Sequence, residues 1–320
     1  MTLARDSTVE QGNLTMRPIT GRDELDLFNR LPYVFNEELA DDLAGGRRRP
    51  EWMWVALRGD HLLARVAWWG RPDNDQPLIL DVFDLDDSSA DRVDIGLALL
   101  RRAMAAVVPA GTRPPEYSRC VPPDWREGGA TGQVVEDRMV VLEQTGARLS
   151  IERLRLQWHP GTPIPEPTGR LRFRAVGDTE ELLAMMTRAL EGTLDEHSRD
   201  DLTRMSAREA AVKHYEEEFA RYRSPRDWWQ VATLPDGEPV GFVIPARNDY
   251  NPLIAYLAVL PEHRGNGYID EILAEGTRLL STQDVPRIRA ATDLGNIPMA
   301  KAFQRAGYVN FERTINMTWH

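Results

Sequence analysis

Residues Val259-Leu260-Pro261-Glu262-His263-Arg264-Gly265-Asn266-Gly267-Tyr268 are the most informative stretch of this chain. An apolar run, Leu253 to Val259, leads into the stretch, and an amphipathic segment, Ile269 to Leu280, follows it. The pattern predicts a strand, a glycine-bearing turn and the start of a helix. Glycines let a backbone come close to a ligand, and the unpaired N–H groups of a helix start point at an anion. The stretch therefore predicts a site for a phosphate-bearing cofactor.

The composition is that of an acidic globular protein. Its 320 residues are enough for two domains, and 42% of them are hydrophobic. A net charge of −11 disfavours general nucleic-acid binding; it either attracts a cationic substrate such as an amine or only keeps the chain soluble. The single cysteine, Cys120, allows no internal disulfide and fits the cytoplasm. No apolar run approaches ~20 residues, so no membrane-spanning helix is expected, and the polar leader Met1–Gly12 lacks the core of a signal peptide.

A proline-rich segment indicates where the chain divides. Residues 159–169 contain four prolines and two glycines, which prevent a helix and favour an extended tether. The segment separates a predicted domain over residues 1–158 from a second over residues 170–320. Because the expected elements follow a similar order in both halves, we predict two copies of one fold.

Hydrophobic periodicity predicts an α/β (α+β) fold in each half, with a mixed, mostly antiparallel sheet flanked by helices. In the second half the order is β, α, α, β, β, β, α, β, α, β. Helices are expected there at 179–190, 207–222, 269–280 and 296–306, and strands at 171–176, 228–233, 240–244, 253–259, 287–292 and 309–318. In the first half, strands are expected at 17–20, 52–57, 61–69, 78–85, 117–121 and 150–158, and the clearest helices at 91–107 and 134–144.

Two sequence blocks of the second half carry a family resemblance. They are Val259-x-Pro261-x-x-Arg264-Gly265-x-Gly267 before a helix, and, about thirty residues later, Asn296-x-x-Met299-x-x-x-Phe303-x-x-x-Gly307-Tyr308. With these blocks the second half resembles the GCN5-related N-acetyltransferase (GNAT) family, in its pyrophosphate turn and its final conserved helix. The paired layout also looks like tandem GNAT proteins of the mycothiol synthase type.

The resemblance implies acetyl-CoA as the cofactor. Backbone N–H groups of the turn would hold the pyrophosphate; the residues are Arg264, Gly265, Asn266, Gly267, Tyr268 and Ile269. The main chain of Leu257, Ala258 and Val259 would bind the pantetheine arm as an added strand. Asn296 would touch the pantetheine or cap its own helix, and Phe303 would line the channel near the thioester.

The sequence departs from the family pattern in three places. Ile269 stands where the family usually has Gly or Ala, and Phe303 stands where many members have a tyrosine that protonates the leaving thiolate. The strand Leu253–Val259 contains no carboxylate to act as a base. In the first half, the matching segment Asp91–Gly96 has acids in place of the glycine turn, so we expect that half to bind no acetyl-CoA.

Four residues are candidates for the chemistry on an amine. Glu196 and His197 lie in the polar loop Gly192–Ser198, which often covers the substrate in GNAT folds; His197 is either a base or a solvated histidine. Asp293, at the end of a strand, either binds a substrate ammonium or is a turn residue. Tyr256 either relays a proton or packs in the core.

The pattern of histidines and cysteines predicts no metal site, because neither HExxH nor CxxC occurs. The resemblance, taken with these candidate residues, implies a cytoplasmic N-acetyltransferase that moves an acetyl group from acetyl-CoA directly to a primary amine of a small polar molecule. Neither a nucleic acid nor a membrane is expected as a partner, and the sequence does not fix the oligomeric state. The alternatives are a non-catalytic acyl-CoA-binding or regulatory module, and another acyl-CoA reaction on the same fold.

Overall fold

The computed structural model describes residues 14–319, and the predicted leader Met1–Gly12 lies outside them. Contacts between residues divide the chain into two units, one ending at Ser150 and including Ile315 onward, the other spanning Ile151–Thr314. The proline-rich segment 159–169 thus belongs to the second unit, where Ile164 packs against the core and Arg278 donates a 2.8 Å hydrogen bond to the carbonyl of Pro165. As domain limits, 1–158 and 170–320 stay predictions.

The first unit is a mixed sheet with helices on it. Its strands follow the order β1 (Leu14–Pro18), β2 (Met53–Arg58), β3 (His61–Trp69), β4 (Ile79–Leu85), β5 (Glu116–Val121) and the end of β12 (Val309–Trp319). Its helices are α1 (Leu25–Phe28), α2 (Leu39–Ala44), α3 (Arg92–Val107) and α4 (Gly129–Glu143). β4 and β5 pair in parallel, whereas β1 to β4 pair antiparallel.

The second unit repeats this architecture. Its strands follow the order β6 (Ala147–Trp158), β11 (Ile288–Asp293), β10 (Pro252–Val259), β9 (Pro239–Arg247), β8 (Gln230–Thr233) and β7 (Arg172–Ala175). Its helices are α5 (Thr179–Ala189), α6 (Glu196–Leu202), α7 (Ala207–Glu217), α8 (Tyr268–Ser281) and α9 (Ile297–Arg305). β10 and β11 pair in parallel, and the other recorded pairs are antiparallel, so the predicted fold class is confirmed.

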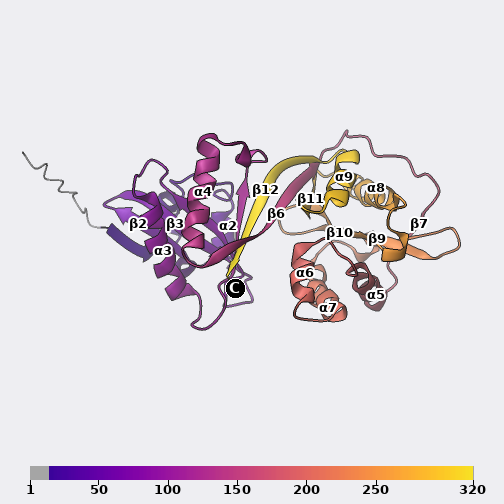
Figure 1. Ribbon diagram of the computed structural model, residues 1–320, viewed down its shortest axis with the longest axis horizontal. Helices are drawn as coiled ribbons and strands as arrows, with labels where there is room; N and C mark the ends of the chain where they lie inside the picture. The colour runs from indigo at the N-terminus through magenta and orange to yellow at the C-terminus, as the bar shows by residue number, and fades with distance from the viewer. Residues whose placement is uncertain (1–13, 320) are drawn as a thin grey trace, which may run out of the picture. The chain divides into compact units, whose positions relative to one another are not determined.

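In the second unit the helices form two layers, with α5, α6 and α7 on one face of the sheet and α8 and α9 on the other (Figure 1). Side chains of β9 alternate between these layers: Phe242 packs toward α5 and α7, and Val243 toward α8. The same alternation along β10 sends Tyr256 toward α5 and α7 and Leu257 toward α8. The sheet therefore separates two apolar cores, one under α5 and α7 and the other under α8.

One helix of this unit differs from the sequence prediction. The predicted loop Gly192–Ser198 contains the start of α6, which Asp195 caps by accepting a 2.8 Å hydrogen bond from the amide of Ser198. Charged residues without an apolar stripe concealed this helix, and the capping residue was the available signal. The helix predicted to reach Tyr222 ends at Glu217, because Phe219–Arg221 forms a 3-10 turn.

Candidate active site

The glycine turn joins the end of β10 to the start of α8. Gly265 and Gly267 have φ angles of +83° and +74°, in the left-handed region that side-chain-bearing residues rarely adopt. A Cβ built on either glycine would meet no heavy atom within 4 Å, so the space beside the turn is open. No side chain caps α8, which leaves the N–H groups of Tyr268 and Ile269 to face that space without a capping partner. The turn has the features of an anion site.

Side chains of the turn stabilise it from behind. The guanidinium of Arg264 donates to the carbonyl of Val259 at 3.2 Å and to those of Ala189 and Glu191 at 2.8 and 2.6 Å, near the end of α5. The amide of Asn266 donates to the carbonyl of His263 at 3.0 Å. Because these polar side chains bind protein carbonyls, the groups left for an anion are those of the backbone.

Two acids in the first turn of α8 are neutralised by arginines. Arg305 lies 2.6 Å from a carboxylate oxygen of Asp270, and Arg170 lies 2.5 Å from one of Glu271. Arg170 also covers the ring of Tyr268, with its guanidinium carbon 5.1 Å from the ring centroid. The ion pairs offset the negative charge that would otherwise repel an anion at the turn.

β10 and β11 separate soon after they pair. Leu253 stands opposite Arg289, and the described residues show no further parallel pair beyond it, so Leu257 and Asp293 lie on either side of a gap. β10 remains paired with β9 as far as Val259, after a bulge between Ile254 and Tyr256. Leu260 donates to the carbonyl of Val240 at 2.8 Å, so by alternation the backbone groups of Leu257 and Val259 face the gap. Such an open edge accepts an extended chain.

Residues of the second motif lie mostly in the core. Asn296 caps α9 by accepting a 3.3 Å hydrogen bond from the amide of Met299, which is one of its two expected roles. Phe303 is fully buried, with its ring centroid 5.0 Å from that of Tyr308, and its role as a channel wall stays a prediction. The hydroxyl of Tyr308 lies 2.8 Å from that of Thr277, and burial raises the pKa of Tyr308. Phe303 has no hydroxyl proton to donate to a thiolate, and the hydroxyl of Tyr308 is bonded to Thr277 inside the core.

Three of the predicted catalytic residues meet at the end of β11; we call this the acidic corner, made of Asp195, Glu196, His197 and Asp293. The backbone N–H of Glu196 donates to Asp293 at 2.7 Å, and Arg153 Nε lies 3.1 Å from the other Asp293 oxygen. Burial raises the pKa of Asp293 despite the opposing charge of Arg153. Burial also acts to raise the pKa of Asp195, but Arg153 and hydrogen bonds from Ser198 outweigh it and lower that pKa.

His197 and the side chain of Glu196 occupy the first turn of α6. His197 lies close enough to Asp195 and Asp293 for its charge to stabilise both carboxylates. The carboxylate of Glu196 is half exposed and pairs with Arg199 at 2.9 Å. Glu196 therefore contributes mainly its backbone N–H to the corner.

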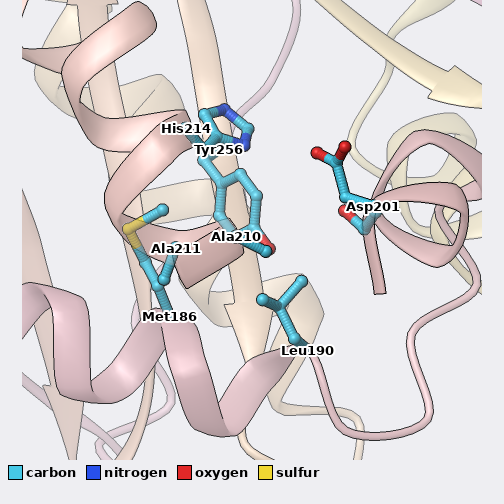
Figure 2. A pocket seen from close by; sticks show the side chains of 8 residues that line it. Met186, Leu190, Asp201, Ala210, Ala211, His214 and Tyr256 are labelled. Atoms are coloured by element: carbon cyan, nitrogen blue, oxygen red, sulfur yellow. The ribbon is translucent and has the colours of Figure 1, made fainter. Parts of the chain in front are cut away.

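Tyr256 lines a pocket beneath α5, α6 and α7 (Figure 2). The free volume of this pocket, including space open to solvent, is about 270 Å³. It is bordered by Met186, Leu190, Ser198, Asp201, Ala210, Ala211, His214 and Tyr256. Burial, with a further contribution from the charge of Asp195, raises the pKa of Tyr256, so its phenol keeps its proton at neutral pH.

Sequence reasoning missed a histidine–glutamate pair at the C-terminal end of α7, where Glu218 is the capping residue. His214 Nε2 lies 3.1 Å from Glu218 Oε2, and the His214 ring centroid lies 5.4 Å from that of Tyr256. Burial acts to raise the pKa of Glu218, but the hydrogen bond and charge of His214, the hydrogen bond from Tyr222 and the charge of Arg153 together outweigh it and lower that pKa. The hydroxyl of Tyr222 donates to the same carboxylate. The spacing of four residues on a helix was the signal that could have revealed the pair.

Two further searches covered the described part of the chain. Across residues 14–319, no helix has the length and apolar character needed to cross a membrane. Over the same residues, no three or more histidine, cysteine, aspartate or glutamate side chains are grouped as ligands for a metal ion.

Comparisons with known proteins agree with this geometry. Residues 170–309 match the family of the acetyltransferase (GNAT) domain. No significant match was found among curated protein sequences. The fold is similar to that of a GCN5-related N-acetyltransferase from Sphaerobacter thermophilus, with a TM-score of 0.59 and 16% identity over 95% of each chain.

Two other solved structures share the fold along almost the whole chain. One is a tandem GNAT protein from the clavulanic acid biosynthesis pathway, with a TM-score of 0.51 and 14% identity over 96% of this chain and 98% of that one. The other is a GNAT-family acetyltransferase from Colwellia psychrerythraea, with a TM-score of 0.50 and 13% identity over 96% of this chain and all of that one. Residues 170–309 therefore match the acetyltransferase (GNAT) domain, in a chain whose fold is similar to that of a tandem GNAT protein.

Proposed function

We propose that the second unit moves an acetyl group from acetyl-CoA to a primary amine of a small polar molecule. The observation that carries this proposal is the gap between β10 and β11 beside the uncapped glycine turn. The turn from Arg264 to Ile269 would bind the pyrophosphate through backbone N–H groups. The edge of Leu257, Ala258 and Val259 would bind the pantetheine arm and direct the thioester into the gap.

The acidic corner would receive the amine. Asp293 lies across the gap from Leu257, where a carboxylate can hold a substrate ammonium near the thioester. His197 is the candidate base in this corner, and the backbone N–H of Glu196 orients Asp293. Tyr256, whose phenol stays protonated, is the candidate for relaying a proton to the leaving thiolate.

The transfer would be a direct attack in a ternary complex. The amine nitrogen would attack the thioester carbonyl carbon, and the carbon–sulfur bond would break to release coenzyme A. The sole cysteine, Cys120, belongs to the first unit, and we assign it no role as an acyl carrier. We place the reaction in the cytoplasm, which the single cysteine favours. The identity of the acceptor, including any likeness to mycothiol synthase, stays a prediction.

A second candidate function is a non-catalytic acyl-CoA-binding module. Phe303 in place of a tyrosine and the absence of a carboxylate from β10 favour it. Incubation of the full chain with acetyl-CoA and a panel of primary amines separates the two functions. The enzyme releases free thiol with at least one amine, at a rate above acetyl-CoA hydrolysis; binding by calorimetry without thiol release across the panel identifies the module.

A further inference from the structure

We propose that His214 removes the proton from the attacking amine and that Glu218 positions His214 for this step. The inference rests on the proposed acetyl transfer and moves the role of base from His197, the candidate in the acidic corner, to a residue outside that corner. It starts from the pocket beneath α5, α6 and α7, where His214 and Tyr256 form one wall and Asp201 lies across from them (Figure 2). Because Tyr256 is the neighbour of Leu257 on β10, this wall stands beside the strand edge assigned to the pantetheine arm.

Glu218 determines which nitrogen of His214 is available. The carboxylate lies 3.1 Å from Nε2, so a neutral imidazole carries its hydrogen on Nε2 and its lone pair on Nδ1. Within the described residues, Nδ1 has no hydrogen-bond partner. Tyr222 donates to Glu218 and orients the carboxylate from its other side. A base held by a carboxylate, itself held by a third group, is the arrangement used in activated catalytic sites.

Ring packing fixes the orientation of the imidazole. Its centroid lies 4.7 Å from the ring of Phe219 and 5.4 Å from that of Tyr256, which meets it edge-on. The titratable groups around His214 are Glu218 at the end of its own helix, Tyr222 beyond that helix, Tyr256 on β10 and Asp201 on α6, and the charge of Arg153 on β6 acts on Glu218. Lys213 pairs with Asp201 at 2.8 Å, so the charge of that carboxylate is already balanced. Glu218 is therefore the charged group that directly controls His214.

His197 and His214 then have different roles. His197 lies beside Asp195 and Asp293, the carboxylates that would hold the ammonium, and its loss should mainly affect amine binding. His214 lies in the pocket without a second carboxylate in direct contact and offers a free lone pair. The free volume of the pocket is about 270 Å³ with space open to solvent included, so it would take only the amine-bearing end of an acceptor.

The proton balance of the step is complete. His214 Nδ1 accepts one proton from the substrate ammonium, and the lone pair that this frees on the nitrogen forms a bond to the thioester carbonyl carbon. The carbon–sulfur bond then breaks, and the electron pair leaves with the sulfur of coenzyme A. The second proton of the acetylated nitrogen passes through Tyr256 to the thiolate and gives the free thiol, and His214 returns its proton to water.

The test compares His214→Ala with the matched variant His197→Ala in the full chain, using acetyl-CoA and the amines that the wild type acetylates. General base catalysis contributes about 10²- to 10⁴-fold, so kcat of His214→Ala should fall at least 100-fold with an unchanged Kd for acetyl-CoA by calorimetry. Added free imidazole should restore part of this rate. His197→Ala should instead raise the KM of the amine and keep kcat within about threefold, because its place is beside the ammonium-binding carboxylates.

Glu218→Gln tests positioning. Its kcat should fall about tenfold, and the pH at which kcat declines on the acid side of the profile should shift. A purely structural residue would leave this pH unchanged. Unchanged kcat and pH profile in His214→Ala, or absence of imidazole rescue, would overturn the inference while acetyl transfer by the wild type stands. If the wild type binds acetyl-CoA but acetylates no amine, the proposed enzyme fails, and so does the base. Absence of acetyl-CoA binding by the wild type would overturn both.

Discussion

The two units contain the same parallel strand pair but fill the gap beyond it differently. In the second unit, β10 and β11 pair at Leu253 and Arg289 and then leave a strand edge open. In the first unit, β4 and β5 pair at Leu80 and Tyr117 and then also separate. There, however, arginine side chains form hydrogen bonds with the backbone of β4. Arg119 donates to the carbonyl of Phe83 at 2.9 Å, and Arg138 donates to that of Leu85 at 3.1 Å.

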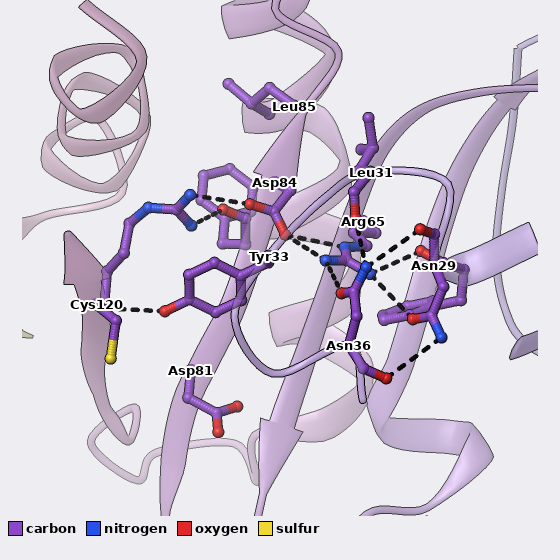
Figure 3. A network of polar contacts seen from close by, with 12 residues as sticks. Asn29, Leu31, Tyr33, Asn36, Arg65, Asp81, Asp84, Leu85 and Cys120 are labelled. Carbon is purple, nitrogen blue, oxygen red and sulfur yellow. Dashed lines mark hydrogen bonds and ion pairs between the residues drawn. The ribbon is translucent and has the colours of Figure 1, made fainter. Parts of the chain in front are cut away.

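A buried network of polar contacts surrounds Asp84 and Arg65 on this side of the first unit (Figure 3). Asp84, 1% exposed, accepts from Arg65 at 2.9 Å and from Arg119 at 3.0 Å. Tyr33 adds a further contact, because its hydroxyl accepts a 2.8 Å hydrogen bond from the amide of Cys120. The place of the glycine turn is taken by a segment with three aspartates, Asp86, Asp87 and Asp91.

The difference shows how one fold can provide either a ligand site or a structural core. The arginines at the edge of β4 already bind the backbone carbonyls to which an added strand would have to form hydrogen bonds. They are buried charges, so separating them from their partners would cost stability. On the same edge of β10, Arg264 donates to the carbonyl of Val259 at the end of the strand, and among the described residues no side chain is bonded to the backbone of Leu257. This contrast supports the prediction that acetyl-CoA binds the second unit and not the first.

The largest expected effect comes from Gly267→Val. A β-branched side chain at φ +74° costs about 1–3 kcal/mol of stability and covers the amides of the turn, so affinity for acetyl-CoA should fall at least 100-fold. The matched control is Gly59→Val in the first unit, where φ is +61° and an added Cβ would also meet nothing within 4 Å. Calorimetry should show unchanged affinity in the control; equal affinity in both variants would break the assignment of the turn.

A second effect concerns stability. Asp84→Asn should lower the free energy of unfolding by about 3–5 kcal/mol, because it leaves buried arginines without their carboxylate. Burial acts to raise the pKa of Asp84, but Arg119 and Arg65 lower it below its usual value. Its stabilising contribution is thus present above the ordinary aspartate range and lost as the pH falls through the lowered pKa. Denaturant unfolding at several pH values measures both, and a loss below 1 kcal/mol would contradict the network's role.

Asp293 should behave in the opposite way. Burial raises its pKa, so between the ordinary aspartate value and the raised one the folded state binds more protons, and this group weakens the fold as the pH rises. Asp293→Asn should therefore cost no more than about 1 kcal/mol at neutral pH, the net contribution of a hydrogen bond. The KM of the amine should rise at least tenfold in the variant. In the wild type the KM should rise as the pH falls through the raised pKa; a pH-independent KM would remove Asp293 from amine binding.

The smallest effect is expected from Asp91→Gly in the first unit. Its carboxylate pairs with Arg58 at 2.8 Å on the surface, and such pairs contribute about 0–1 kcal/mol. A glycine at this position supplies backbone freedom but leaves Arg119 and Arg138 on the strand edge. Calorimetry should still count one acetyl-CoA per chain, and a second equivalent would refute the idea that these arginines block the first unit.

The sequence allowed the order of most elements and the two-unit fold to be predicted, because their apolar periodicity is strong. It also indicated the turn, since the glycines and Arg264 occupy fixed positions between a strand and a helix. It did not show α6, whose charged surface gives no periodic signal, nor the His214–Glu218 pair, whose importance depends on the proximity of Tyr256. The sequence also did not allow the filled gap of the first unit to be predicted, because Arg65, Asp84 and Arg119 meet only through tertiary packing.

The central claim is tested most directly by a crystal structure of the full chain grown with coenzyme A. We predict one molecule per chain, with its diphosphate on the backbone amides between Arg264 and Ile269 and its pantetheine along Leu257 to Val259. Coenzyme A in the gap between β4 and β5, or an empty glycine turn at a saturating concentration, would contradict the account.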